Sequence, residues 1–223
     1  WLDNDGALPR INSLLASYDF EGRQLSNLAP NSEVREGGSD LIAENGVHGQ
    51  GLLFDEKNSL SLHDLGIQNE TSPFSVSLWI KLAPAALSET SLVRLGTPGH
   101  GFEIRIQSSR IQARWSRAWP QNAIAATSTI PLFAPYRWGH LVVSSDGSRH
   151  SDGFQIFFNG RPIDLDLHSG HLTKSILTSE PAMTFQGAGV MIDELQIFAQ
   201  ALTPIEAAQL FDGNSLTDAF AKK

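Results

Sequence analysis

Short runs of alternating apolar and polar residues recur along most of this chain, separated by clusters of Gly, Pro, Asn, Asp and Ser. The run at residues 74–82, FSVSLWIKL, places Phe74 and every second residue after it on one apolar face. Residues 101–107 repeat the pattern, and Asn159-Gly160 supplies the two-residue turn of a hairpin. Such turn signals return about every ten residues, which favours an antiparallel β-sandwich over alternating strands and helices.

The most specific stretch lies near the C-terminus, at residues 190–213, and begins as a strand. Alternation predicts that Met191, Asp193, Leu195 and Ile197 share one face, so that a single carboxylate lies in an apolar row. A carboxylate there requires a cation or several hydrogen-bond donors, because burying it unpaired is costly.

A short helix is predicted directly after this strand, over residues 203–211. Thr203 is a typical N-cap, Pro204 suits the first helical position, and Glu206 completes a capping box. The side chains expected to pack on the sandwich are Ala207, Leu210 and Phe211.

Composition excludes several classes of protein. The 223 residues contain no cysteine, which rules out a thiol nucleophile, an iron–sulfur cluster and a cysteine zinc site. The net charge is −8, and without a basic stripe no nucleic-acid partner is expected. No apolar run approaches the length of a membrane span, so no membrane insertion is expected.

One domain is predicted, over residues 17–213, with a lead-in at 1–16 and a tail at 214–223. The lead-in is expected to form a helical turn through residues 8–15. The start at Trp1, without a signal segment, is interpreted as that of a piece cut from a longer protein.

Six segments in order resemble the laminin-G-like, concanavalin-A-like jelly-roll modules of bacterial exported proteins. The resemblance implies an all-β, two-sheet antiparallel jelly roll with one short C-terminal helix, in an extracytoplasmic multi-domain protein. The segments are LASYDFEG (15–22), GVHGQGLLFDEKNSLSL (46–62), FSVSLWIKL (74–82), YRWGHLVVSSDG (136–147), FQIFFNG (154–160) and MIDELQIFAQALTPIEAAQLF (191–211).

Modules of this kind are non-catalytic, so the resemblance implies a domain that binds a glycan or a protein ligand. The alternative is a structural spacer that contacts only the neighbouring domains of its parent chain. Glycosidases of the same sandwich are a distant third, because they carry acids at alternate positions of one strand. Here Met191 and Leu195 occupy the positions on either side of Asp193.

Asp19 and Asp193 are the candidate metal ligands. In the family the terminal strands pair, which would bring these two carboxylates together for a structural calcium ion. The alternative is that Asp193 accepts backbone N–H bonds at a strand end while Asp19 faces water.

A second metal hypothesis involves Asp164, Asp166, His168 and His171. The first three share one strand face, and such a stripe can bind a transition metal. A strand facing solvent has the same composition, and this simpler interpretation is preferred.

The candidate ligand-binding residues are His100, Arg114, Arg117 and Trp119. Sugar rings stack on Trp, while Arg donates hydrogen bonds to hydroxyls, carboxylates or sulfates, so this group is predicted to form a glycan platform. Trp115 continues an inward alternation and is expected in the core, whereas Trp119 precedes a proline and is expected in a loop.

Overall fold

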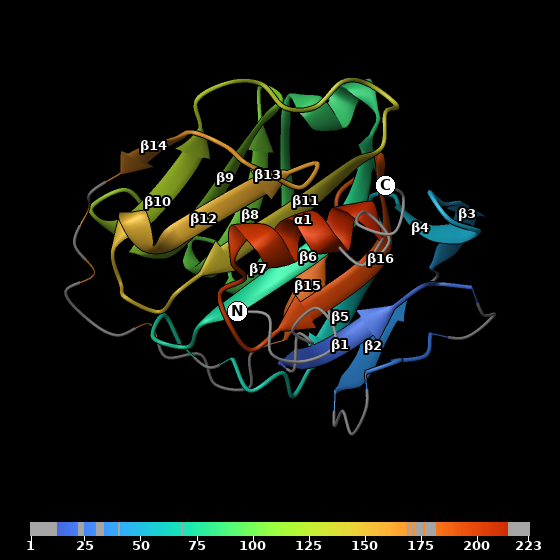
Figure 1. Ribbon diagram of the computed structural model, residues 1–223, viewed down its shortest axis with the longest axis horizontal. Coiled ribbons are helices and arrows are strands. Elements are labelled where there is room, and N and C mark those ends of the chain that lie inside the picture. Colours follow the sequence, from blue (N-terminus) through green and yellow to red (C-terminus); the bar gives the residue numbers. More distant parts are fainter. Residues whose placement is uncertain are drawn as a thin grey trace, which may run out of the picture.

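The computed structural model describes residues 13–21, 25–29, 34–39, 41–67, 69–168, 170, 172, 176 and 182–213. Within these residues the strands form two antiparallel eight-stranded sheets packed face to face (Figure 1). The predicted two-sheet sandwich is therefore confirmed.

The front sheet carries the α-helix on its outer face (Figure 1). Its last strand in sequence, β16, pairs with β6 on one side and with both β1 and β4 on the other. Its strands, in spatial order, are β13 (Arg161–Pro162), β12 (Phe154–Phe158), β11 (Gly139–Ser145), β6 (Phe74–Leu82), β16 (Val190–Phe198), β4 (Gln50–Phe54) and β3 (Ile42–Asn45), with β1 (Leu14–Tyr18) beside β16.

The back sheet lies behind it in Figure 1. Two 3-10 helices, η1 (Pro84–Leu87) and η2 (Ser151–Gly153), lie in the connections. The back sheet's strands, in spatial order, are β14 (Leu165–His168), β10 (Asn122–Ser128), β9 (Arg110–Ala118), β8 (His100–Gln107), β7 (Glu89–Thr97), β15 (Met183–Phe185), β5 (Ser59–His63) and β2 (Arg35–Ser39).

The core fills the space between the sheets with the inward-facing residues of both. Trp115 is fully buried there, as its alternation predicts, and meets Phe74 and Phe102. Phe74 and Phe102 themselves pack edge to face with their centroids 4.9 Å apart. These aromatic contacts join the front strand β6 to the back strands β8 and β9.

The alternation predicted for β16 breaks in the middle of the strand. Glu194 has a φ of 48°, and the pairing with β6 shifts register between Asp193 and Gln196, so Glu194 lies in a β-bulge. Because a bulge adds one residue, Leu195 joins the core-facing side of Ile192. The predicted single face of Met191, Asp193, Leu195 and Ile197 is therefore wrong.

The N-terminal strand also differs from expectation. Leu14 and Leu15 belong to β1, so the predicted helical turn is wrong at these residues, while residues 8–12 lie outside the described residues. The expected pairing of the terminal strands is confirmed, with Tyr18 opposite Leu195.

The helix α1 (Pro204–Asp212) begins as the sequence predicts. The Oγ1 of Thr203 accepts the N–H of Glu206, and Oε2 of Glu206 accepts the N–H of Thr203 at 2.7 Å. Its buried residue, Ala207, packs in a cluster that lies on the front sheet's outer side, and the cluster contains Val142, Phe157, Phe198 and Leu202.

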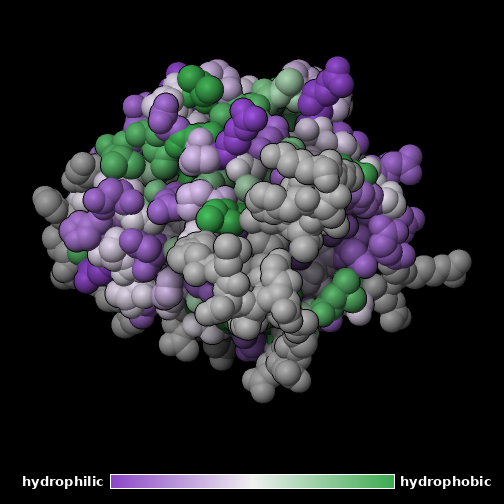
Figure 2. All heavy atoms as spheres, viewed as in Figure 1, coloured by the Kyte–Doolittle hydropathy of each residue, from purple (hydrophilic) through white to green (hydrophobic). Residues whose placement is uncertain are grey.

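The helix makes the two outer faces of the sandwich different. Figure 2 shows the face that carries α1, where hydrophobic residues gather toward the β12–β14 side and hydrophilic residues are scattered among them. Between β12 and β14, Phe154, Ile163 and Leu167 line a groove of about 400 Å³. The back sheet's outer face is on the far side of both views.

Candidate functional site

A row of directly opposed residues crosses the outer face of the back sheet from one edge to the other. Strand pairing aligns one outward residue from each strand, and none of the eight is a large apolar residue. Seven strand spacings make the row roughly 34 Å long. From β2 to β14 the cross-strand row is Gly37, Ser61, Thr184, Arg94, Glu103, Arg114, Ala125 and His168.

The arginines in and beside this row converge on the carboxylate of Glu103, which is 7% exposed. The Nη2 of Arg114 donates to its Oε2, while Nη2 of Arg94 lies 3.8 Å and Nε of Arg105 4.0 Å from its Oε1. Arg105 also pairs with the exposed Glu89. A buried carboxylate requires such partners, so Glu103 holds the three guanidinium groups together.

Trp119 lies over the β14 end of this row. The guanidinium of Arg114 lies 5.0 Å from its ring centroid, and the His168 ring lies 5.0 Å away on centroids. The Nε2 of His168 lies 3.1 Å from the carbonyl oxygen of Pro120. Trp119 remains 40% exposed, so its ring is supported by two neighbours and still faces solvent.

A second row, of small residues, runs beside the cross-strand row. Gly101 has a φ of 131°, and a Cβ there would collide with the carbonyl oxygen of Leu95. Ser116 is buried, and its Oγ has no hydrogen-bond partner among the described residues. The row contains Gly96, Gly101, Ser116 and Ala123, so this strip is free of bulky side chains.

Two of the four residues predicted for the glycan platform meet as expected, Arg114 and Trp119. His100 lies two residues before the core residue Phe102 on β8, so its side chain is on the core-facing side of the sheet and not on the face of Arg114 and Trp119. Arg117 is the extra residue of a bulge between β9 and β10 and is exposed at the strand end.

Sequence reasoning missed Arg94 and Glu103, and it considered His168 only as part of a metal stripe or, by preference, of a solvent-facing strand. The alternation of β8 placed Glu103 on the solvent side, but only the register of β7, β8 and β9 shows that the three arginines converge. No motif marks that register in the sequence.

Asp193 is fully buried and accepts three backbone hydrogen bonds. Its Oδ2 accepts the N–H groups of Val47 and His48 at 2.8 and 3.0 Å, and its Oδ1 that of Glu194 at 2.8 Å. Burial raises the pKa of Asp193, and the three donors oppose that effect. This is the hydrogen-bonded arrangement that was the alternative to calcium.

The other predicted calcium ligand, Asp19, accepts the N–H of Glu21 at 3.2 Å. It lies near enough to Glu194 to help raise the pKa of that carboxyl, for which burial is the larger cause. A donor-lined carboxylate such as Asp193 does not suit a cation, and the described residues hold no group of three or more His, Asp or Glu side chains arranged for a metal. Calcium binding stays a prediction.

The four residues of the second metal hypothesis do not lie together on one strand. Asp166 and His168 lie on β14, whereas Asp164 precedes it and its carbonyl accepts the N–H of Thr129. His168 packs against Trp119 instead. His171 lies outside the described residues.

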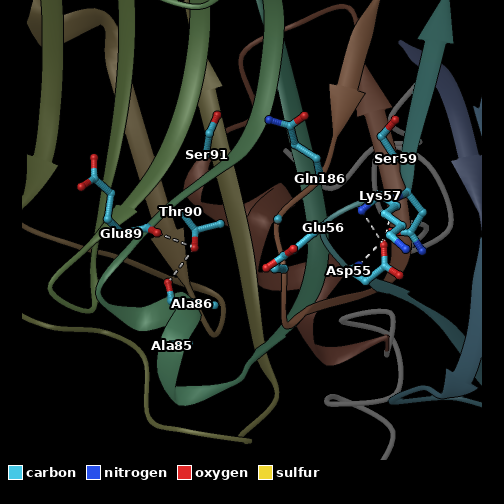
Figure 3. A pocket seen from close by; sticks show the side chains of 13 residues that line it. Asp55, Glu56, Lys57, Ser59, Ala85, Ala86, Glu89, Thr90, Ser91 and Gln186 are labelled. Carbon is cyan, nitrogen blue, oxygen red and sulfur yellow. Dashed lines mark hydrogen bonds between the residues drawn. The ribbon is translucent and has the colours of Figure 1, made fainter.

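Two pockets lie outside the cross-strand row. One, of about 470 Å³, opens between the turn after β4, η1 and the turn before β16 (Figure 3). Asp55 there accepts two N–H bonds of its own turn, and Thr90 donates to a carbonyl of η1. Glu89 lines this pocket and pairs with Arg105, so the pocket adjoins the row.

The other pocket, of about 570 Å³, lies between α1 and the front sheet. Trp79, His140 and Phe211 line it, with ring centroids 5.4 to 6.0 Å apart. His140 is 2% exposed; its Nε2 lies 3.0 Å from the Ser77 hydroxyl, and burial lowers its pKa to about 4. A neutral, buried histidine suits a packing role beneath the helix.

Comparison with known families gives the fold its name. Residues 54–208 match the family model Laminin_G_3, described as the concanavalin A-like lectin/glucanases superfamily. The chain belongs to this family. The resemblance drawn from the sequence is therefore confirmed. All residues of the cross-strand row lie within the matched region of this concanavalin A-like module except Gly37, which precedes it.

Solved structures similar to this concanavalin A-like chain are binding domains of toxins. The binding domain of Paraclostridial Mosquitocidal Protein 1 has a TM-score of 0.72 at 17% identity, over 91% of this chain and 52% of that chain. The binding domain of botulinum neurotoxin DC in complex with rat synaptotagmin II has a TM-score of 0.70 at 17% identity, over 91% of this chain and 52% of that chain. The same domain in complex with SialylT has a TM-score of 0.70 at 16% identity, with the same two coverages.

At this level of identity these likenesses establish the fold, and the chain spans about half the length of each neighbour. No functionally curated protein matched the sequence. Among the described residues no helix is long and apolar enough to cross a membrane.

Proposed function

We propose that this domain is a non-catalytic binding module that recognises glycans on the outer face of the back sheet. The observation that carries the proposal is Trp119, which is 40% exposed although Arg114 and His168 support its ring. A ring fixed in this way offers a flat apolar surface without losing further side-chain freedom on binding. Sugar rings stack on such a surface through their C–H faces.

The row that leads away from Trp119 supplies the polar groups a glycan requires. Ser61 and Thr184 contribute hydroxyls, 3.1 Å apart, toward the far end. The solved neighbours support this proposal, because their names describe binding domains, in one case in complex with SialylT.

The competing functions have weaker support. A glycosidase needs two carboxylates facing one cleft, whereas Asp193 is buried and committed to three backbone donors. A spacer needs no exposed, supported aromatic ring. A protein ligand is the second candidate, because one neighbour is described in complex with synaptotagmin II.

We place the module in a larger exported protein, outside the cytoplasm. Support comes from the family resemblance and from neighbours described as binding domains of toxins, whose solved chains are about twice as long as the part that matches. Expression of the full-length gene product with its flanking domains, followed by cell fractionation, tests this placement.

The glycan-binding proposal predicts that Trp119→Ala weakens binding at least tenfold, or about 1.4 kcal/mol. A glycan array identifies ligands for the wild-type domain, and titration calorimetry then compares the variants. Tyr136→Ala is the matched control, because Tyr136 is an aromatic residue that is 66% exposed and hydrogen-bonds through its N–H to the front strand β6. Equal affinity in Trp119→Ala, or no glycan bound at millimolar concentration, would favour the spacer.

A further inference from the structure

The two arginines of the cross-strand row, and Arg105 beside them, differ in how much of each side chain reaches solvent. The Arg114 side chain is 8% exposed and lies between Glu103 and Trp119. Those of Arg94 and Arg105 are 22% and 21% exposed. Arg114 therefore supports the tryptophan, while the side chains of Arg94 and Arg105 remain partly exposed to solvent.

The local charges do not cancel. Three guanidinium groups, those of Arg94, Arg105 and Arg114, face the two carboxylates of Glu103 and Glu89. This group therefore has one positive charge in excess, on a chain whose net charge is −8. The excess is local, so it favours an anion through contact at this position and gives little long-range attraction.

The donors of these side chains are not equally accessible. A guanidinium has five N–H donors, and within the described part of the chain the Nε of Arg94 and the Nε of Arg105 are buried without a hydrogen-bond acceptor. Contact with a ligand therefore falls to the terminal Nη groups of the two arginines. The contacts the structure records for Arg94 are Ser91 and Glu103. Planar, charged donors of this kind pair best with carboxylate and sulfate groups.

The position of these donors relative to Trp119 sets the geometry of a ligand. Arg114, which touches Trp119, is on β9, and Arg94 is two strands away on β7. Two strand spacings amount to roughly 10 Å. A sugar stacked on Trp119 therefore does not reach Arg94 itself, whereas the next residues of an oligosaccharide lying across the strands do.

We propose that the cross-strand row binds an acidic oligosaccharide across the strands, with a carboxylate or sulfate ester received by Arg94 and Arg105 while another sugar of the same chain stacks on Trp119. The inference rests on the glycan-binding function proposed above and specifies its ligand class. Glu103 sets the spacing of the guanidinium groups, and Arg114 connects them to the aromatic platform.

The experiment compares ligands that differ only in charge. Titration calorimetry measures the wild-type domain with oligogalacturonate and with its methyl ester, which removes the carboxylate charge. A second pair, a sulfated carrageenan oligosaccharide and the same oligosaccharide after desulfation, separates sulfate from carboxylate as the source of the anionic group. We expect the acidic member of at least one pair to bind about tenfold more tightly than its neutral partner.

Variants then locate the effect on the sheet. Arg94→Gln and Arg105→Gln should each reduce the preference for the acidic ligand, and Arg105→Lys, which keeps the charge, should retain part of it. Arg161→Gln is the control, because Arg161 is exposed on the edge strand β13 of the front sheet. Thermal unfolding of each variant confirms that it is folded.

The outcomes are distinguishable. Acidic and neutral ligands that bind equally, both weakened by Trp119→Ala, would overturn the inference and leave glycan binding in place. A preference that persists unchanged in both Arg→Gln variants would also overturn it. No Trp119-dependent binding of any of the four ligands would overturn the inference, and the proposed function fails as well if the glycan array finds no ligand whose binding depends on Trp119.

Discussion

His140 shows how one residue can make the stability of this domain depend on pH. It lies on β11, is 2% exposed, and burial lowers its pKa from an ordinary 6.5 to about 4. Between these two values the unfolded chain binds a proton that the folded chain does not. Stability is therefore complete above pH 6.5 and falls as the pH falls toward 4.

The expected loss is about 3 kcal/mol of unfolding free energy over this range, since each pKa unit corresponds to about 1.4 kcal/mol. Urea unfolding at a series of pH values measures it as the difference between wild type and His140→Gln, which has no titrating ring. His150→Gln is the control, because His150 is exposed. A wild-type slope that His140→Gln leaves unchanged would contradict the assignment.

At the same scale, alternation predicts which way a side chain points but not what it meets. The period of two on β9 places Trp115 inward and Arg114 outward, and both placements agree with the structure. The convergence of Arg94 and Arg114 on Glu103 depends on strand register, which is set by pairing across the whole sheet and by a shift between Ser91 and Val93. Local sequence does not carry that information.

At the scale of elements, the capping box of α1 was the feature best predicted from sequence. Its residues are close neighbours in the chain, so spacing alone determines the contact. The bulge of β16 was missed for a different reason. Its positive φ falls on Glu194 and not on glycine or asparagine, so no residue type marks it.

Thr203→Ala is expected to lower the unfolding free energy by about 1 kcal/mol, because the N–H of Glu206 loses its side-chain acceptor. Denaturant titration measures the shift of the midpoint at constant slope. Thr203→Ser keeps the hydroxyl and should retain most of the stability. A midpoint for Thr203→Ala equal to that of wild type would mean that the cap contributes nothing.

At the scale of the whole molecule, β16 ties the front sheet together, because it pairs with three strands, β1, β4 and β6. Asp193 extends this role to the loop before β4 through the N–H groups of Val47 and His48. The loop is also closely packed: a Cβ on Gly46 would collide with the Asp193 carboxylate. The sandwich fold could be predicted correctly because the sequence resembles its family. The roles of Asp193 and of the arginines in the cross-strand row follow only from how the strands pair in three dimensions.

These contacts lead to a final prediction, about metal. If the three backbone donors satisfy Asp193, the melting temperature should not change after exhaustive chelation and return of calcium. Asp193→Ala should lower it with or without the ion, because the donors lose a buried acceptor.

A calcium site at Asp19 and Asp193 would behave differently: at a hundred times its dissociation constant, calcium would add about 2.7 kcal/mol to the unfolding free energy. For a domain of this size that corresponds to a rise of roughly 5–10 °C. Such a rise in wild type, absent from both Asp19→Ala and Asp193→Ala, would show that the carboxylates hold an ion and that the hydrogen-bonded arrangement changes when calcium binds.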